Sequence, residues 1–167
     1  MASGDTLVVF TPLHNEPPTA NFATLDLRNN HPVLDFDATT DEEAVFSGYL
    51  PENYDGGGLT ITIIWMASSA TSGDVVWQVA IESHTDDADD LDSDSFAAFN
   101  GSGAVTAPSA SGEPGYDNVT FTTGADMDSL AKDESFRLKV RRDADDTSAT
   151  DNMSGDAELT KVVVKET

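Results

Sequence analysis

The chain has 167 residues, with 31 acidic against 8 basic side chains, a net charge of −23 and no cysteine. This length suits one domain with a two-sheet core, and the lack of cysteine excludes disulfides and thiolate metal sites. So negative a surface repels nucleic acid phosphates and anionic lipid, which disfavours a nucleic-acid or membrane partner. The amino terminus lacks the pattern of an export signal, so we expect synthesis in a cytoplasm.

The amino-terminal residues predict a strand followed by an extended segment. A strand-like apolar run covers Thr6–Phe10. Prolines remove backbone donors and fix extended geometry, and three of them follow this run: Pro12, Pro17 and Pro18. We therefore interpret residues 11–21 as an arm or loop and residues 1–21 together as an extended N-terminal arm. Two short strands are predicted beyond it, at 22–28 and 33–37, around a turn formed by Asn29-Asn30-His31-Pro32.

Residues 43–83 carry the clearest strand pattern. Apolar and polar residues alternate in three runs separated by clusters of Gly, Pro, Ser and Asp, which is typical of strands buried on one face. The predicted strands cover 43–50, 59–68 and 74–83. Trp65 and Trp77 share the phase of the aliphatic residues in their runs, which favours core packing over an exposed sugar-stacking platform.

The second half of the chain continues the same pattern. An acidic loop at 85–95 is expected to return to the core at Phe96 and Phe99, and residues 101–115 are expected to form a loop with one short strand at Val105. The remaining elements are strands at 118–123, 135–142 and 157–165 and one or two helical turns at 125–132. Eight to ten short strands with little helix, within a single domain of residues 1–167, predict an all-β sandwich of the jelly-roll type.

The acidic loop raises the question of a calcium site. Asp90, Asp92 and Asp94 have the alternate spacing that lets carboxylates converge on a hard cation. The EF-hand pattern fails, because loop positions 6 and 12 counted from Asp90 hold Ser95 and Gly101. A calcium site of another kind and a charged, solvated loop remain the two interpretations.

The sequence contains no recognisable catalytic motif. The histidines, His14, His31 and His84, fall in three separate loop contexts, which disfavours a zinc triad. The chain has many serines but lacks the G-x-S-x-G elbow of a nucleophilic serine. We therefore expect a protein that is not an enzyme and that needs no cofactor.

Half of the positive charge falls on one predicted strand. Arg137, Lys139 and Arg141 share one face of 135–142, while Phe136, Leu138 and Val140 share the other: a basic stripe opposite an apolar one. One interpretation is cross-strand pairing with acids on a neighbouring strand. The other is contact with acidic loops of a second copy, which would fix the register of a symmetric oligomer.

Several segments together resemble small all-β proteins of phage and environmental viruses. They are TPLHNEPP at 11–18, the stretch from Ala23 to Ser83, and FRLKVRRDADD followed by GDAELTKVVVKE near the carboxyl end. Residues 85–95 and 101–117 lie outside the resemblance. It implies a jelly-roll virion component, namely a trimeric head decoration or cement protein. Such a protein binds the major capsid protein at threefold positions on the outer surface of a tailed-phage head and stabilises the head.

The resemblance also implies where contacts would form. Arg137, Lys139 and Arg141 become candidates for contacts between subunits, and the arm around Pro12, Pro17 and Pro18 becomes a candidate for reaching a neighbouring subunit or the capsid. The protein would be made in the host cytoplasm and reside on the virion. A tail-fibre or receptor-binding, carbohydrate-binding jelly-roll domain is the alternative function.

Overall fold

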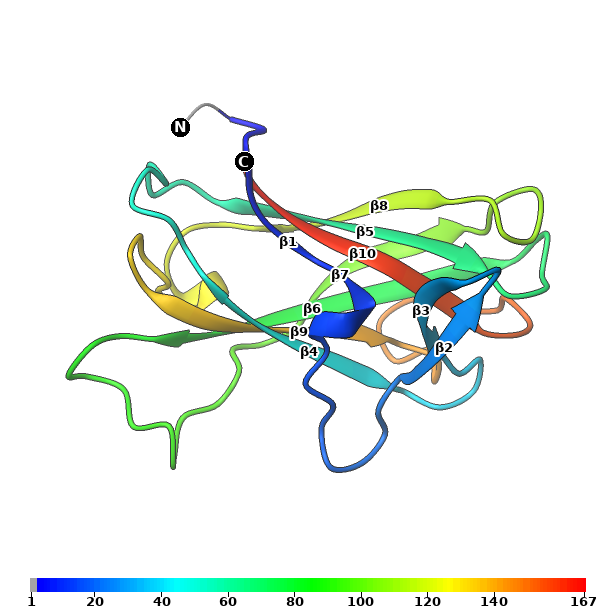
Figure 1. The fold of residues 1–167 in the computed structure, drawn as a ribbon, viewed down its shortest axis with the longest axis horizontal. Coiled ribbons are helices and arrows are strands. Elements are labelled where there is room, and N and C mark those ends of the chain that lie inside the picture. Colours follow the sequence, from blue (N-terminus) through cyan, green and yellow to red (C-terminus); the bar gives the residue numbers. More distant parts are fainter. Residues whose placement is uncertain (1–2) are drawn as a thin grey trace.

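The computed structural model describes residues 3–167, which form two antiparallel sheets packed face to face (Figure 1). The first sheet has the order β2-β3-β10-β5-β8, with β1 also paired to β10, and the second has the order β4-β9-β6-β7. The strands are β1 (Thr6–Phe10), β2 (Thr24–Arg28), β3 (His31–Phe36), β4 (Glu43–Tyr49), β5 (Leu59–Ala67), β6 (Asp74–His84), β7 (Asn100–Thr106), β8 (Gly115–Phe121), β9 (Ser135–Arg142) and β10 (Ala157–Glu166). Two 3-10 turns accompany them: η1 (Pro12–His14) and η2 (Ala125–Met127).

The strand order is that of a jelly roll. Strands β3 to β10 divide into β3-β10-β5-β8 in one sheet and β4-β9-β6-β7 in the other. Every connection among these eight strands crosses between the sheets except the one from β6 to β7, which are neighbours in one sheet. Two four-stranded sheets linked in this way form the double Greek key of the jelly-roll sandwich. The fold class predicted from the sequence is confirmed.

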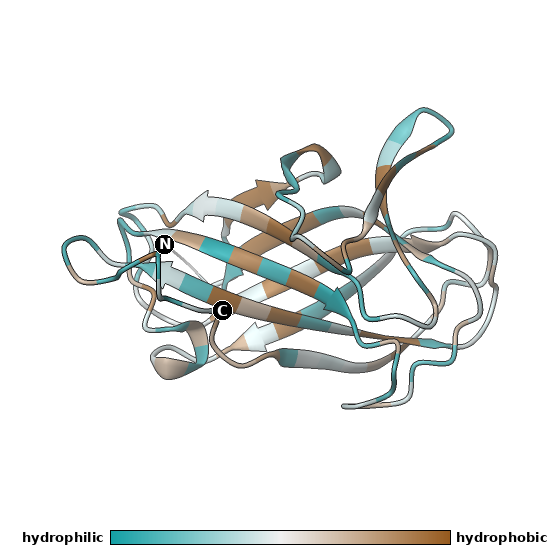
Figure 2. Cartoon of the chain, turned by 90° about the horizontal axis from the view of Figure 1, so that it is seen from below, coloured by the Kyte–Doolittle hydropathy of each residue, from teal (hydrophilic) through white to brown (hydrophobic). Residues whose placement is uncertain are grey.

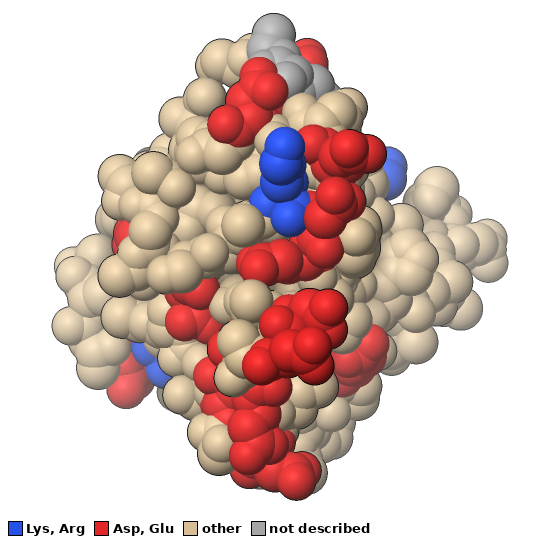
Figure 3. Space-filling view, turned by 90° about the vertical axis from the view of Figure 1, so that its left-hand side faces the viewer, with Lys and Arg blue, Asp and Glu red and all other residues tan. Residues whose placement is uncertain are grey.

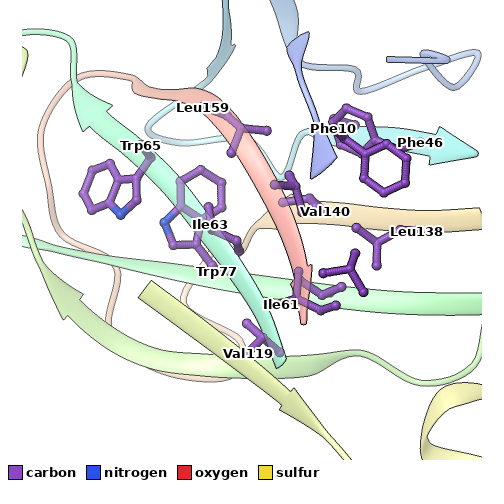
Figure 4. Packing of buried hydrophobic residues seen from close by; sticks show 14 of the residues in the cluster. Phe10, Phe46, Ile61, Ile63, Trp65, Trp77, Val119, Leu138, Val140 and Leu159 are labelled. Carbon is purple, nitrogen blue, oxygen red and sulfur yellow. The ribbon is translucent and has the colours of Figure 1, made fainter. Parts of the chain in front are cut away.

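The core lies between the sheets and is rich in aromatic rings. Hydropathy alternates along several strands, as expected where one strand face is buried (Figure 2). Trp65 and Trp77 are fully buried with ring centroids 5.8 Å apart, and Phe10 stacks on Phe46 at 5.3 Å (Figure 4). The core position predicted for both tryptophans is confirmed.

The strand β7 is longer than the sequence suggested. The expectation of a loop with a short strand at Val105 is wrong, because Asn100–Thr106 pairs with β6. Its sequence, NGSGAVT, has two glycines and no alternating apolar run, and most of its residues are exposed or half-buried. Backbone pairing with a strong neighbouring strand therefore forms β7 where side-chain pattern gives no signal.

The hairpin between β2 and β3 is tighter than predicted. Asn29 and Asn30 alone form its turn, with φ values of 47° and 64°, and His31 and Pro32 belong to β3. Two-residue hairpin loops need positive φ at both central positions, which asparagine tolerates better than most side chains. The backbone of Arg28 therefore pairs directly with that of His31.

The expected extended arm packs against its own chain wherever the structure describes it, and its first two residues lie outside the described part. Residues 6–10 form β1, which pairs with β10, and Pro12 begins η1 and is buried. The following residues run along the open edge of β4: the Glu16 N–H donates to the Val45 carbonyl, and Asn15 Oδ1 accepts from the Val45 N–H. An unpaired sheet edge exposes backbone donors and acceptors, and the arm satisfies some of them here.

Candidate interaction surface

Acidic and apolar side chains occupy different parts of the surface. Three loops at one end of the sandwich, 50–58, 85–99 and 122–134, carry 12 of the 31 acidic residues. Figure 3 shows Asp and Glu gathered along this end. By contrast, residues 6–34 contain only two acids, Glu16 and Asp26.

The acid-poor segment also supplies most of the large apolar side chains that face solvent. Five of the eight described come from it: Val9, Leu13, Phe22, Leu25 and Leu27. Leu13 and Leu27 are 68% and 63% exposed, although each costs free energy when it contacts water. Clustered exposed apolar residues mark interaction sites in soluble proteins. We call the surface formed by these five side chains and the two grooves described next the acid-poor surface.

Two grooves flank Leu13. The larger has a volume of about 440 Å³, and its lining is mainly apolar, including Pro12, Pro32, Met66 and Pro114. The smaller, about 290 Å³, lies between Leu13, Pro17, Phe22 and Leu25. Pro12 lines both grooves, so the two grooves lie next to each other.

Arg28 fixes the β2–β3 hairpin beside the larger groove. Its Nη1 donates to the carbonyl oxygens of Ala67 and Ser68 and lies 2.5 Å from Glu158 Oε2. Its Nη2 donates to Ser111 Oγ at 2.8 Å. Bonds to three separate segments hold the end of β2 in place, while β2 itself is an edge strand that pairs with β3. The leucines of β2 are thus presented on an anchored support.

The predicted proline contacts fall partly on this surface. Pro12 is buried in the groove wall, Pro17 is exposed in the smaller groove, and Pro18 is half-buried. Their contact with a subunit or capsid stays a prediction. Sequence reasoning missed Leu13, Phe22, Leu25 and Leu27. The signal that would have found them is the scarcity of acids across 6–34, since the leucines of TLDLR alternate as core residues do.

The basic stripe is engaged within the chain. Arg137 pairs with Glu82 at 3.3 Å, Lys139 with Glu43 at 3.2 Å, and Arg141 with Asp41 at 3.3 Å. Glu82 lies on β6 and Glu43 on β4, the two strands that flank β9. The cross-strand pairing predicted from the sequence is confirmed, whereas the proposed role between subunits stays a prediction.

Two phenylalanines, Phe96 and Phe99, cover the same stripe, so the expectation that they return the chain to the core is wrong. Lys139 Nζ lies 4.5 Å from the centre of the Phe96 ring, and Arg141 Cζ lies 4.2 Å from that of Phe99. The Ala97 N–H between them donates to the Ile81 carbonyl at 2.9 Å. We call residues 85–99 the strap. Its aromatic end covers part of the charged outer face of the second sheet.

The carboxylates predicted to hold calcium do not converge. Asp90 and Asp92 are exposed, and Asp90 Oδ1 accepts the Asp92 N–H. Within residues 3–167, the group whose oxygens lie within 4.8 Å of one another is instead Asp41, Asp143 and Asp145. Burial opposes ionisation of Asp143, but hydrogen bonds from Ser148 and Thr147 outweigh it and lower the pKa. These internal donors already satisfy that carboxylate.

The histidines make local contacts, and the tyrosines divide between the core and the surface. His14 Nδ1 accepts the Thr11 N–H at 3.0 Å and stabilises η1. His84 lies near Glu82, and both are on β6 of the second sheet. Tyr54 is buried, and its hydroxyl donates to the Gly57 carbonyl, whereas Tyr49 and Tyr116 are exposed. Across residues 3–167 there is no helix long and apolar enough to cross a membrane.

Comparison with known proteins gives structural likeness without a family. No family model matches the chain, and no curated protein matches its sequence. Similar solved structures include the CBM22-1 xylan-binding domain of Xyn10C from Paenibacillus barcinonensis, with 12% identity and a TM-score of 0.48 over 99% of this chain and 96% of that one. At this level of similarity we draw no functional conclusion from it.

Proposed function

We propose that this chain is a non-catalytic structural protein that binds an assembled protein shell, in the manner of a head decoration protein of a tailed phage. The observation that carries this proposal is the acid-poor surface. A chain with a net charge of −23 keeps five large apolar side chains exposed, and it keeps them where acids are scarce. Covering apolar surface of this kind with another surface lowers the free energy, which favours binding to a partner.

The sequence resemblance supplies the kind of partner. The order of strands and turns in residues 11–18 and 23–83 is similar to that of phage virion proteins. These residues include the arm and β2, which form part of the acid-poor surface. The proposed partner is therefore the major capsid protein, bound by a homotrimer at threefold positions on the outside of the head. Binding to the assembled lattice and not to free subunits stabilises the head by mass action. The acidic loops at the far end of the sandwich then face solvent and disfavour contact with nucleic acid.

Co-sedimentation with capsids tests the proposal. Undecorated heads, assembled from the major capsid protein encoded in the same viral genome, are mixed with the purified chain and pelleted. We expect the wild-type chain to pellet with heads, Phe22→Asp to bind at least about tenfold more weakly, and Leu91→Asp to bind as the wild type does. Leu91 is a matched control, because it is 63% exposed on the strap, outside the acid-poor surface.

A glycan array distinguishes the alternative. Failure of the wild-type chain to bind heads, or equal binding by Phe22→Asp, would overturn the proposal. Specific sugar binding together with either result would favour a receptor-binding or carbohydrate-binding domain.

A further inference from the structure

We infer that the acid-poor surface binds a second copy of this chain, with Leu25 and Leu27 of one copy seated in the larger groove of its neighbour. The inference rests on the docking role proposed above for this surface and names its occupant. It commits to contact between copies through Leu25, Leu27 and the larger groove, and it leaves Phe22, which lines the smaller groove, to the capsid protein.

Charge restricts where two copies can meet. Each copy carries a net charge of −23, so contact through the acid-rich loops brings like charges together and is strongly disfavoured. Residues 6–34 hold two of the 31 acids, and both are engaged locally: Glu16 accepts from Ser47 Oγ and Asp26 from the Leu27 N–H. Asp35 on β3 feels the negative charges of Asp26 and Glu158, of which Glu158 is paired with Arg28. Contact through this surface therefore costs less electrostatic free energy than contact through the acid-rich loops.

The same chain presents both a projection and a receptor for it. Leu25 and Leu27 are 53% and 63% exposed on β2, an edge strand of the first sheet. The larger groove, about 440 Å³, is lined by apolar atoms of η1, β3, β5 and the loop before β8. Leucine side chains suit such a lining in size and polarity. A projection and a groove on different patches of one molecule allow a head-to-tail interface between identical copies.

The two halves also carry opposite charges. Asp26 lies between the two leucines of the projection, and its carboxylate bonds to the Leu27 N–H. Lys161 lies in the groove lining, is exposed, and makes no ion pair with any residue of the described chain. When β2 occupies the groove of the neighbouring copy, Asp26 approaches Lys161, which forms no ion pair within its own described chain. This complementarity favours a second copy, because another copy supplies both leucines for the groove and a groove for the leucines.

Solution mass is the first arm of the test. Light scattering coupled to size exclusion measures the wild-type chain, Leu27→Asp, and the control Leu91→Asp at one protein concentration and in moderate salt. We expect a wild-type mass of at least twice 17.7 kDa, the same mass for Leu91→Asp, and self-association weakened at least about tenfold in Leu27→Asp. Both leucines are 63% exposed, so the two substitutions are matched in burial.

Cysteine cross-linking is the second arm and does not depend on weakening anything. The chain lacks cysteine, so single variants can be mixed without background. A mixture of Leu27→Cys and Lys161→Cys is expected to form disulfide-linked pairs faster than a mixture of Leu91→Cys and Lys161→Cys. Because each variant carries one cysteine, every linked pair joins two copies.

Two results would overturn the inference: a monomeric wild-type chain, or an oligomer in which Leu27→Asp and the cross-linking rates match their Leu91 controls. Head binding separates this failure from failure of the proposed function. A monomer that binds heads and loses binding on Leu27→Asp would assign the surface to the capsid protein. An oligomer broken by Leu27→Asp that never binds heads would keep the inference and overturn the proposed function.

Discussion

At the scale of single residues, Arg142 and Asp151 form a fully buried ion pair between β9 and the loop that follows it. Arg142 Nη2 lies 2.7 Å from Asp151 Oδ1, and Nε lies 2.9 Å from Oδ2. The guanidinium also donates to the carbonyls of Gly155 and Met153, at 2.9 Å each. These bonds tie the loop of residues 143–156 to the sheet, together with the backbone bonds from Asn152 and Met153 to the Asp74 carbonyl.

Removing one partner leaves a buried charge without compensation. We expect Asp151→Ala to lower the free energy of unfolding by about 3–5 kcal/mol, measured by urea denaturation. The control is Arg137→Gln, which breaks a partly exposed pair and should cost less than about 1 kcal/mol. Equal effects of the two substitutions would contradict the structural role given to the buried pair.

Asp35 makes stability depend on pH. Burial raises its pKa from 3.8 to about 6, with further contributions from the negative charges of Glu158 and Asp26, and its Oδ1 has no hydrogen-bond partner. A raised carboxyl pKa means that the folded state binds the proton more tightly. Its contribution to stability is therefore complete below pH 3.8 and is lost as pH rises to about 6.

The substitution Asp35→Asn removes this titration. We expect it to stabilise the protein at pH 8 by about 1 kcal/mol and to change little at pH 4, since partial solvation screens the roughly 3 kcal/mol that the shift would otherwise represent. Thermal melts across pH 4–8 measure the effect. Asp92→Asn, on the exposed strap, corrects for the general benefit of removing one negative charge. A gain independent of pH would refute the assignment.

At the scale of elements, the strap is held by few contacts and should open separately from the sandwich. Its aromatic end rests on Lys139 and Arg141 through ring contacts, and the Ala97 N–H bonds to β6. Contacts between a cation and a ring at exposed sites contribute about 0.5–1 kcal/mol. We expect Phe99→Ala to speed hydrogen exchange of the Ala97 amide about two- to fivefold with little change in global stability.

The control for the strap is Leu91→Ala, which removes an exposed side chain from the same segment. Unchanged exchange in Phe99→Ala would show that the backbone bond alone holds the strap. A large loss of global stability would show that the strap belongs to the cooperative core.

Which elements could be predicted from the sequence follows from burial. Strands β4, β5, β6 and β9 alternate because one face of each packs in the core, and their predicted bounds agree with the structure to within one or two residues. Strand β7 gave almost no signal, since its glycines contribute no side chain to a face. Residues 11–21 form no strand, as predicted, but prolines report extended backbone without reporting what that backbone contacts.

The candidate surface was harder to predict for a related reason. Leu25 and Leu27 alternate with Asp26 as buried residues do, and only the three-dimensional position of β2 at a sheet edge exposes them. The basic stripe was visible, but its partners Glu82 and Glu43 come from strands brought together by the fold. Side-chain pattern reports which residues share a face, and topology decides whether that face is covered.

At the scale of the whole molecule, the net charge of −23 should make stability rise with salt. Salt screens the repulsion among 31 acidic side chains and also weakens the ion pairs, so the two effects have opposite signs. Partly exposed pairs contribute at most about 1 kcal/mol each, and 8 basic residues cannot pair with most of the acids. Repulsion should therefore dominate, and the melting temperature should increase between 20 mM and 1 M NaCl by about 2–4 °C for each kcal/mol relieved.

A strap variant with Asp86, Asp87, Asp89, Asp90 and Asp92 replaced by Asn tests the cause. Five fewer negative charges change the net charge from −23 to −18, so the variant should melt higher than the wild type at low salt and respond less to NaCl. Both proteins are compared at one concentration, because self-association would couple melting to concentration. A melting temperature that falls with NaCl would mean that the ion pairs of the basic stripe contribute more to stability than the repulsion among acids removes. In that case the acidic loops would act on solubility and partner choice and not on the stability of the sandwich.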